Sequence, residues 1–318
     1  MSLKSPASPS TDHAPRLAGL NADPAFHAIA APELQHRVRL SHAVEQIKMF
    51  SQRHIGLPLG AIALAIWRHR YPGADRVERF GLPCHTIRDT LGTSALTVEV
   101  DPRQLVQVAE LPRRSSKEHP STLAFIWEGD WDLRRTDLRG AFWIDYMRDL
   151  DQNRDHLERT YMFQKHMAAL QAGKPKRLHR EGVLLNTPER IIEYLKVYLG
   201  FLDTMATEGY QNDRPNTGIG VLVTREGRLL KTRQGMHRTA MAQWVGLPRI
   251  PVEVRHIHRT WWNKVTAGTT GQEALDRMVQ ALSECTPEMH PGPADPEPPF
   301  IMPDDFWPAP KKTVHRPD

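Results

Sequence analysis

The residues best suited to chemistry form a short turn, Gly235-Met236-His237-Arg238-Thr239, which leads into an apolar helical pattern ending at Val245. Glycine lets a backbone approach a ligand closely. The first N–H groups of a helix have no acceptor within the helix and lie at the positive end of its dipole, so they bind anions. Arg238 could give a forked pair of hydrogen bonds to a phosphate, and His237 could donate a hydrogen bond or move a proton near neutral pH. The turn therefore predicts phosphate binding.

A structural interpretation of the same turn stays open. Glycine could simply end a hairpin, with Arg238 solvated, His237 packed and the helix serving as a crossover. In the binding interpretation, four nearby residues assist the turn. Lys231 on the preceding strand adds positive potential. The auxiliary set consists of Gln234, Lys231, Arg255 and His256.

Three carboxylates are candidates for catalysis. Asp130 and Asp132 flank Trp131, and two carboxylates at this spacing could hold Mg²⁺ if their loop folds over the Gly235 turn. The alternative, which we favour, is a capping loop with a buried tryptophan. Glu189 stands at the start of a predicted helix, where it could be catalytic or could only complement the helix dipole. No metal site made by protein ligands alone is expected, because the pair His256 and His258 lacks a third ligand.

These residues need elements that position them. Apolar periodicity predicts helices over 32–71 (broken at Pro58 and Gly60), 141–170, 187–205 with Thr187 as N-cap, 239–245, and 271–282. Alternation predicts strands over 95–100, 105–108, 122–127, 219–224, 229–233 and 250–256. The fold class expected is α/β (α+β), with a mainly helical N-terminal half and a small mixed sheet with a crossover helix in the C-terminal half.

The expected organisation has four parts: a disordered tail over 1–30, a helical and β-containing region over 31–180, a domain over 181–285, and a Pro-rich tail over 286–318. The apolar helix ending at Trp67 has two interpretations, a hairpin packed on the protein or an amphipathic helix lying on a membrane or a partner. Its apolar run is too short to span a bilayer, so no transmembrane segment is predicted.

Composition narrows the partners only slightly. The chain has 318 residues and a formal net charge of +5, which favours nucleotides, nucleic acid or anionic lipid as partners. The two cysteines exclude a disulfide framework and fit a reducing compartment. With no apolar signal segment near the N-terminus, a cytoplasmic location is expected.

The pattern Gly235-x-His237-Arg238, followed by alanines in the helix and by Gly246-Leu-x-x-Ile-Pro-Val252, resembles the ParB/sulfiredoxin superfamily. The resemblance covers residues 185–262 and is nearest to the uncharacterised and serine-kinase-like members. It implies that the turn binds nucleotide phosphates. Sulfiredoxins carry a catalytic cysteine where this chain has Met236, and the serine kinases carry an aspartate where it has Gln234. Sulfinic acid reduction is therefore not expected, and kinase chemistry would need another acid.

The leading hypothesis is a nucleotide- or phosphate-binding protein that uses Mg²⁺ and a nucleoside triphosphate, ATP or CTP. It could transfer phosphate to a small hydroxyl compound, which the sequence does not identify. The alternatives are a ParB-like nucleic-acid-binding protein, although no helix-turn-helix domain follows Trp262, and a non-catalytic interaction scaffold.

Overall fold

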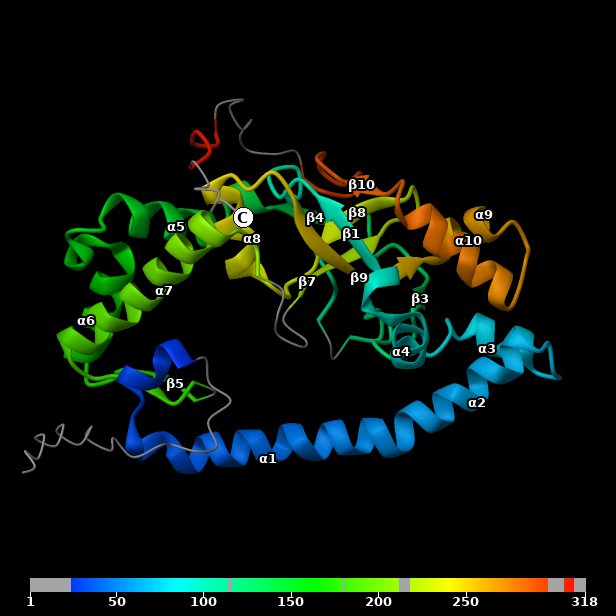
Figure 1. Cartoon of the computed structure of the whole chain (residues 1–318), viewed down its shortest axis with the longest axis horizontal. Helices are drawn as coiled ribbons and strands as arrows, with labels where there is room; N and C mark the ends of the chain where they lie inside the picture. Colours follow the sequence, from blue (N-terminus) through cyan, green and yellow to red (C-terminus); the bar gives the residue numbers. More distant parts are fainter. Residues whose placement is uncertain (1–23, 114–115, 180, 212–217, 297–305, 312–318) are drawn as a thin grey trace, which may run out of the picture.

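The computed structural model describes residues 24–113, 116–179, 181–211, 218–296 and 306–311. Its centre is one mixed β-sheet whose main path has the order β1-β9-β7-β8-β2-β4 (Figure 1). The strands are β1 (Thr97–Val100), β9 (Ile250–His258), β7 (Ile219–Val223), β8 (Arg228–Lys231), β2 (Gln107–Ala109) and β4 (Arg135–Asp137). Two short strands join the sides of this path, β3 (Ile126–Trp127) beside β9 and β10 (Thr286–Pro287) beside β8.

The run of apolar residues in β7 explains its central place in the sheet. All five residues of β7 are buried, as expected for a strand covered on both faces. It pairs in parallel with β9 and antiparallel with β8. The strands predicted at 219–224 and 250–256 are confirmed, and the structure places them side by side.

Helices gather in three places around the sheet (Figure 1). One group contains α5 (Phe142–Gln152), α6 (Tyr161–Gln171), α7 (Pro188–Glu208) and α8 (Met236–Val245), and a second contains α9 (Arg259–Thr266) and α10 (Gln272–Leu282). The third contains α1 (Gln35–Ser51), a π-helical segment η3 (Gln52–Gly56), α2 (Leu57–Arg68), α3 (Ala74–Arg79) and α4 (Cys84–Ala95). The short remaining elements are 3₁₀ turns and a separate hairpin, at η1 (Pro24–Ile29), η2 (Pro32–Leu34), η4 (Leu138–Gly140), η5 (Leu157–Arg159), β5 (Lys176–Leu178) and β6 (Val183–Leu185).

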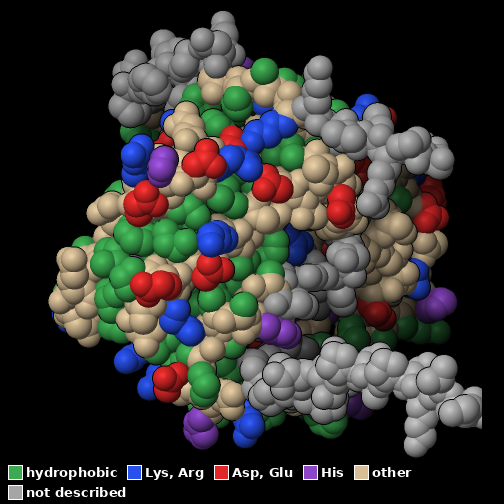
Figure 2. Space-filling model, turned by 60° about the vertical axis from the view of Figure 1, so that its left-hand side comes forward, with side chains coloured by type: hydrophobic (Ala, Val, Ile, Leu, Met, Phe, Trp, Pro, Cys, Tyr) green, Lys and Arg blue, Asp and Glu red, His purple; other side chains and the backbone are tan. Residues whose placement is uncertain are grey.

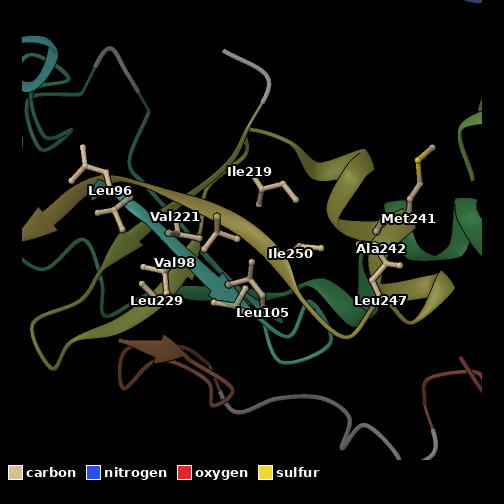
Figure 3. Packing of buried hydrophobic residues seen from close by; sticks show 14 of the residues in the cluster. Leu96, Val98, Leu105, Ile219, Val221, Leu229, Met241, Ala242, Leu247 and Ile250 are labelled. Atoms are coloured by element: carbon tan, nitrogen blue, oxygen red, sulfur yellow. The ribbon is translucent and has the colours of Figure 1, made fainter. Parts of the chain in front are cut away.

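The main core lies between the sheet and the helices. Figure 3 shows Met241 and Ala242 of α8 near Leu247 and Ile250, with the aliphatic side chains of β1 and β7 behind them. Helix α8 is thereby held against the same face of the sheet as Ile219. Its N-terminus lies where β7 begins.

The sheet crosses the domain boundary predicted at residue 180. Strand β1 pairs with β9, and β2 pairs with β8, so strands from both sides of the boundary share hydrogen bonds. One cluster of buried residues extends from Phe26 to Cys285. The N-terminal region and the predicted C-terminal domain therefore do not have separate cores, because β7–β9 need further strands to complete the sheet.

Both predicted tails are partly ordered, which corrects the sequence interpretation. Phe26 and Ile29 are buried within the segment assigned to the first tail. In the second tail, Thr286 pairs with β8, and Lys311 N–H donates to the carbonyl of Val245. Residues 1–23, 297–305 and 312–318 of the predicted tails lie outside the described residues. Local composition missed these contacts because they are made with distant parts of the chain.

Two predicted helix boundaries were wrong. The chain does not break at Pro58 and Gly60, because α1 continues through η3 into α2, and the wider π-helical turn of η3 immediately precedes Pro58. The helix predicted over 141–170 is two helices, since residues 153–160 turn the chain. Among the described residues no helix is both long and apolar enough to cross a membrane.

Candidate functional site

The turn before α8 requires glycine at position 235. Gly235 has φ 80° and ψ 24°, a left-handed conformation that other residues adopt only with strain. A Cβ atom there would lie 3.1 Å from the Cα atom of Ile219. The turn is therefore pressed against the first residue of β7, and it directs the start of α8, with Met236 in first position, over the end of the sheet.

Lys231 fixes this turn from inside the protein. Its side chain is fully buried, and Nζ donates hydrogen bonds to the carbonyls of Thr232, at 2.6 Å, and Gln234. Burial, together with the positive charge of Arg255, lowers the pKa of Lys231 to about 7. The amine thus orders the backbone that leads to Gly235, a role more specific than the added positive potential predicted for it.

Thr239 is also committed to the turn. Its N–H and its hydroxyl Oγ1 both donate to the carbonyl of Gly235, each at 3.0 Å. The side chain is buried. Because the hydroxyl hydrogen is already used, Thr239 closes the first turn of α8 and does not offer that hydrogen to a ligand.

His237 faces the helices and not the open side of the turn. Its ring packs against Trp143, at 4.2 Å between centroids, and against Tyr198 of α7, at 5.1 Å. Burial lowers the pKa of His237 to about 4. The imidazole is neutral at pH 7, so the expected proton transfer near neutral pH is not supported. Its Nδ1 atom is buried without a hydrogen-bond partner among the described residues.

Arg255 occupies a β-bulge beside the turn. Val221 pairs with Val254 and Leu222 pairs with His256, which leaves Arg255 as the extra residue of β9. A bulge of this kind redirects a side chain and is common next to functional sites. A Cβ atom on Gly220 would lie 3.2 Å from Arg255 Cγ and 3.4 Å from Gln234 Oε1. Arg255, Gln234 and the Gly235 turn therefore meet at the start of β7.

One carboxylate and a second arginine complete this corner. Arg255 Nη2 lies 2.8 Å from Glu253 Oε2, and Arg88 Nε donates to Glu253 Oε1 at 3.0 Å. Burial and the neighbouring Arg88 guanidinium lower the pKa of Arg255. Two guanidinium groups thus share one carboxylate. Among the described residues, Arg255 Nε has no hydrogen-bond partner.

Sequence reasoning missed Glu253 and Arg88. Glu253 had a signal, because a Glu and an Arg two apart interrupt an otherwise apolar strand. Arg88 had none, since α4 lies 165 positions earlier in the chain and no local pattern links it to β9. Arg238, in the third position of α8, is half-buried near the same turn.

The acidic candidates lie elsewhere. Asp132 is fully buried and binds the backbone N–H of Arg225 at 2.9 Å and its guanidinium Nη2 at 2.7 Å. Asp130 contacts the same guanidinium at 2.9 Å. Arg225 follows the end of β7, whereas Gly235 touches its beginning, and four residue steps of strand span about 13 Å. The condition for a metal role, that this loop folds over the Gly235 turn, is therefore not met, and Trp131 is buried as in the favoured alternative.

Glu189 is also remote from the turn. It is fully exposed in the first turn of α7, where Thr187 caps the helix as predicted. Its pKa is lowered by hydrogen bonds at that cap. Tyr198, which contacts His237, is nine residues further on, or about 13 Å along the helix. The position of Glu189 fits the helix-dipole interpretation.

His256 has a packing role in this structure. Its ring stacks on Trp127 with centroids 3.8 Å apart, and Nδ1 lies 2.9 Å from the carbonyl of Ala124. Burial lowers its pKa to about 3. His258 contacts the carbonyl of Gly129 instead. Within the described ranges, no three His, Cys, Asp or Glu side chains are grouped to hold a metal ion.

On the face shown in Figure 2, acidic and basic side chains are interspersed with apolar ones. The basic excess of the sequence is not gathered into one patch among the described residues visible there.

No protein-family model, curated protein or solved structure matches this chain. The candidate site therefore rests on its own geometry.

Proposed function

We propose that this protein binds a phosphate-bearing ligand, a nucleotide in the first instance, where the Gly235 turn meets Arg255. The observation that carries the proposal is Arg255. Its side chain is only 12% exposed, it is displaced by a bulge toward the turn, and its Nε has no hydrogen-bond partner among the described residues. A buried guanidinium is costly unless its charge and its donors are satisfied.

The charge of the corner supports an anionic ligand. Glu253 balances one of the two guanidinium groups of Arg88 and Arg255, which leaves one positive charge. The N-terminus of α8 adds backbone donors and the positive end of its dipole. Gly220 and Gly235 keep side chains away from the backbone at this point. A phosphate group would satisfy Arg255 and the helix end together.

Phosphoryl transfer would require more than this corner supplies. A kinase mechanism needs a carboxylate that positions the acceptor, and Mg²⁺ bridging the phosphates. Among the described residues, Glu253 is the carboxylate that the fold brings to the turn, and it is engaged by both arginines. We therefore propose binding, with ATP or CTP as the nucleotides to test first, and leave transfer to a hydroxyl acceptor as a second question for the same assay.

The test is a thermal-shift series with ATP, CTP, GTP, ADP and inorganic phosphate, each with and without Mg²⁺. A ligand that binds only the folded protein raises the melting temperature. We expect Arg255→Ala to weaken the binding of the active ligand at least tenfold, about 1.4 kcal/mol. The matched control is Arg277→Ala, an exposed arginine of α10 that should leave affinity unchanged. No shift with any compound, or equal affinity in the two variants, would refute the proposal.

A further inference from the structure

Among the described residues, helix α1 mainly contacts its neighbours in the chain, η2 and η3. It runs along the lower edge in Figure 1 and continues through η3 into α2 as one rod of about 50 Å. Only Val38 of α1 is buried, and every residue from 43 to 51 is exposed. Most helical stability in proteins comes from the packing of an apolar face against other structure. The exposed segment therefore needs a partner surface.

The exposed side of the rod is apolar. Six side chains, each 58–69% exposed, form what we call the outer stripe: Leu40, Val44, Ile47, Ile55, Leu59 and Ile62. No charged residue occurs between Ile55 and Trp67. A helix that is apolar all round is normally covered on all sides, yet the outer half of α2 is exposed.

The other side of α2 is anchored to the body. A Cβ atom on Gly60 would lie 3.2 Å from Thr86 Cβ, and Leu64 and Trp67 are buried. Trp67 Nε1 also donates to Glu78 at 2.7 Å. Because this face fixes the rotation of α2, the outer stripe cannot turn inward to be covered by its own sheet.

The π-helical segment keeps the stripe continuous. In an uninterrupted α-helix, a residue eight positions after Ser51 would be rotated by about 80° from it. The wider turn of η3 accommodates one additional residue, which brings Leu59 to within about 20° of Ser51 and places Ile62 about 80° from it, at the edge of the stripe. The stripe residues then lie 11, 7 and 4 positions before Ser51 and 4, 8 and 11 positions after it.

This arrangement is nearly symmetric about Ser51, and a twofold interface requires such self-complementarity. In an antiparallel pair of rods, Leu40 would face Ile62 of the second copy, Val44 would face Leu59, and Ile47 would face Ile55. The alternating spacing of three and four residues is that of helices packed side by side.

Charge selects the antiparallel orientation. The α1 half of the rod and η3 carry Arg37, Arg39, Lys48 and Arg53, against Glu45 as the one acidic residue. Parallel rods would place these cations beside their own copies. In the antiparallel orientation, Arg37 and Arg39 lie beside residues 57–67 of the second copy, which carry no charge, while Lys48 and Arg53 of the two copies remain near each other at the centre.

The area is sufficient for a stable contact. Burying one Val, Leu or Ile side chain removes about 100 Å² of apolar surface from water, at roughly 25 cal/mol per Å². With Phe50 beside it, the outer stripe offers on the order of 500 Å², which is close to the apolar share of a standard interface of about 800 Å² per partner. We propose that the outer stripe is the contact surface of a homodimer in which the α1–α2 rods of two copies pair antiparallel about Ser51.

Sedimentation velocity of the full chain tests the dimer. We expect the unmutated protein to be a dimer at micromolar concentration and Ile47→Glu to be a monomer. Because Ile47 is exposed and lies outside the core, the fluorescence of the buried tryptophans should be retained, and any loss of helical circular dichroism should be confined to the rod. The control Gln46→Glu changes a residue about 100° round the helix from Ile47, away from the outer stripe, and should remain dimeric. A monomeric unmutated protein, or a dimer that Ile47→Glu does not weaken, would overturn the proposal.

Cross-linking tests the register. Both natural cysteines are buried, so a new exposed thiol is not in competition with them. Ser51→Cys should form a disulfide-linked dimer on mild oxidation, and Gln46→Cys should not. Equal cross-linking of both variants would contradict pairing about Ser51. Vesicles of anionic phospholipid provide the remaining comparison: a monomer that binds them, and loses this binding in Ile47→Glu, would assign the stripe to a membrane surface and reject the dimer.

Discussion

Arg255 lies directly over Gly220, with its Cγ atom 3.2 Å from the point that a Cβ atom on Gly220 would occupy. The same Cβ atom would lie 2.7 Å from Thr232 Oγ1, which donates to the carbonyl of Gly220 at 3.0 Å. The absence of a side chain at position 220 is thus what allows the bulged arginine to cross β7 toward the Gly235 turn.

Gly220→Ala should therefore disturb the candidate site more than the fold. We expect a loss of about 1–3 kcal/mol of stability from overpacking and at least a tenfold weaker affinity for the ligand identified by thermal shift. Denaturant titration and binding measurements check the two effects. The control is Gly200→Ala in α7, where a Cβ atom meets nothing within 4 Å; it should stabilise by up to about 1 kcal/mol and leave affinity unchanged.

Asp132 and Asp130 contact the same arginine, but replacing each should change stability by a different amount because only Asp132 is buried. Asp132 is completely buried, whereas the side chain of Asp130 is 78% exposed. Asp132→Ala removes hydrogen bonds to the Arg225 side chain and backbone N–H, although Arg225 is 28% exposed and keeps its contact with Asp130. We therefore expect a loss of about 1–3 kcal/mol and unfolding at lower denaturant concentration. Asp130→Ala should change stability by less than about 0.5 kcal/mol. If folded Asp130→Ala bound nucleotide more weakly, the loop that contains Asp130 would instead be part of the binding site.

Lys231 should make stability depend on pH above neutrality. Burial lowers its pKa from 10.5 to about 7 in the folded protein. Between these values the unfolded chain holds a proton that the folded protein lacks, so the free energy of unfolding should rise as the pH increases from 7 to 10.5. Below pH 7 the lysine is charged in both states and this dependence ends.

Lys231→Met should remove that rise, which denaturant titrations at several pH values would detect. Lys264→Met, which removes an exposed lysine of α9, should retain it. An unchanged pH profile in Lys231→Met would show that Lys231 keeps its proton throughout this range.

Glu78 should be a structural link between α2 and α9. Its two carboxylate oxygens accept from Trp67 Nε1 at 2.7 Å and from Trp262 Nε1 at 3.0 Å. Both indoles are buried, and an unsatisfied buried donor costs about 1–3 kcal/mol. Glu78→Ala should thus destabilise by 2 kcal/mol or more on this estimate, with a change in tryptophan fluorescence. Glu128→Ala, which removes an exposed partner of Arg259, should have little effect.

The sequence determined the elements whose signals are local. Thr187 and Pro188 begin α7 as predicted, the strands over 219–223 and 250–258 form, and Gly235 starts a helix that ends before Gly246. These outcomes depend on capping, on fixed or permissive backbone angles, and on the period of apolar residues. Each of these acts over a few neighbouring positions.

Tertiary structure decided what those elements bring together. The bulge that directs Arg255 depends on the register between β7 and β9, and Arg88 reaches Glu253 from 165 positions away. Asp132 binds Arg225, and the ring of His237 packs among aromatic side chains. The sequence of the turn does not encode either contact. Register and long-range pairing follow from which surfaces can be buried together, so local patterns predicted the turn at Gly235 but not the arginine beside it.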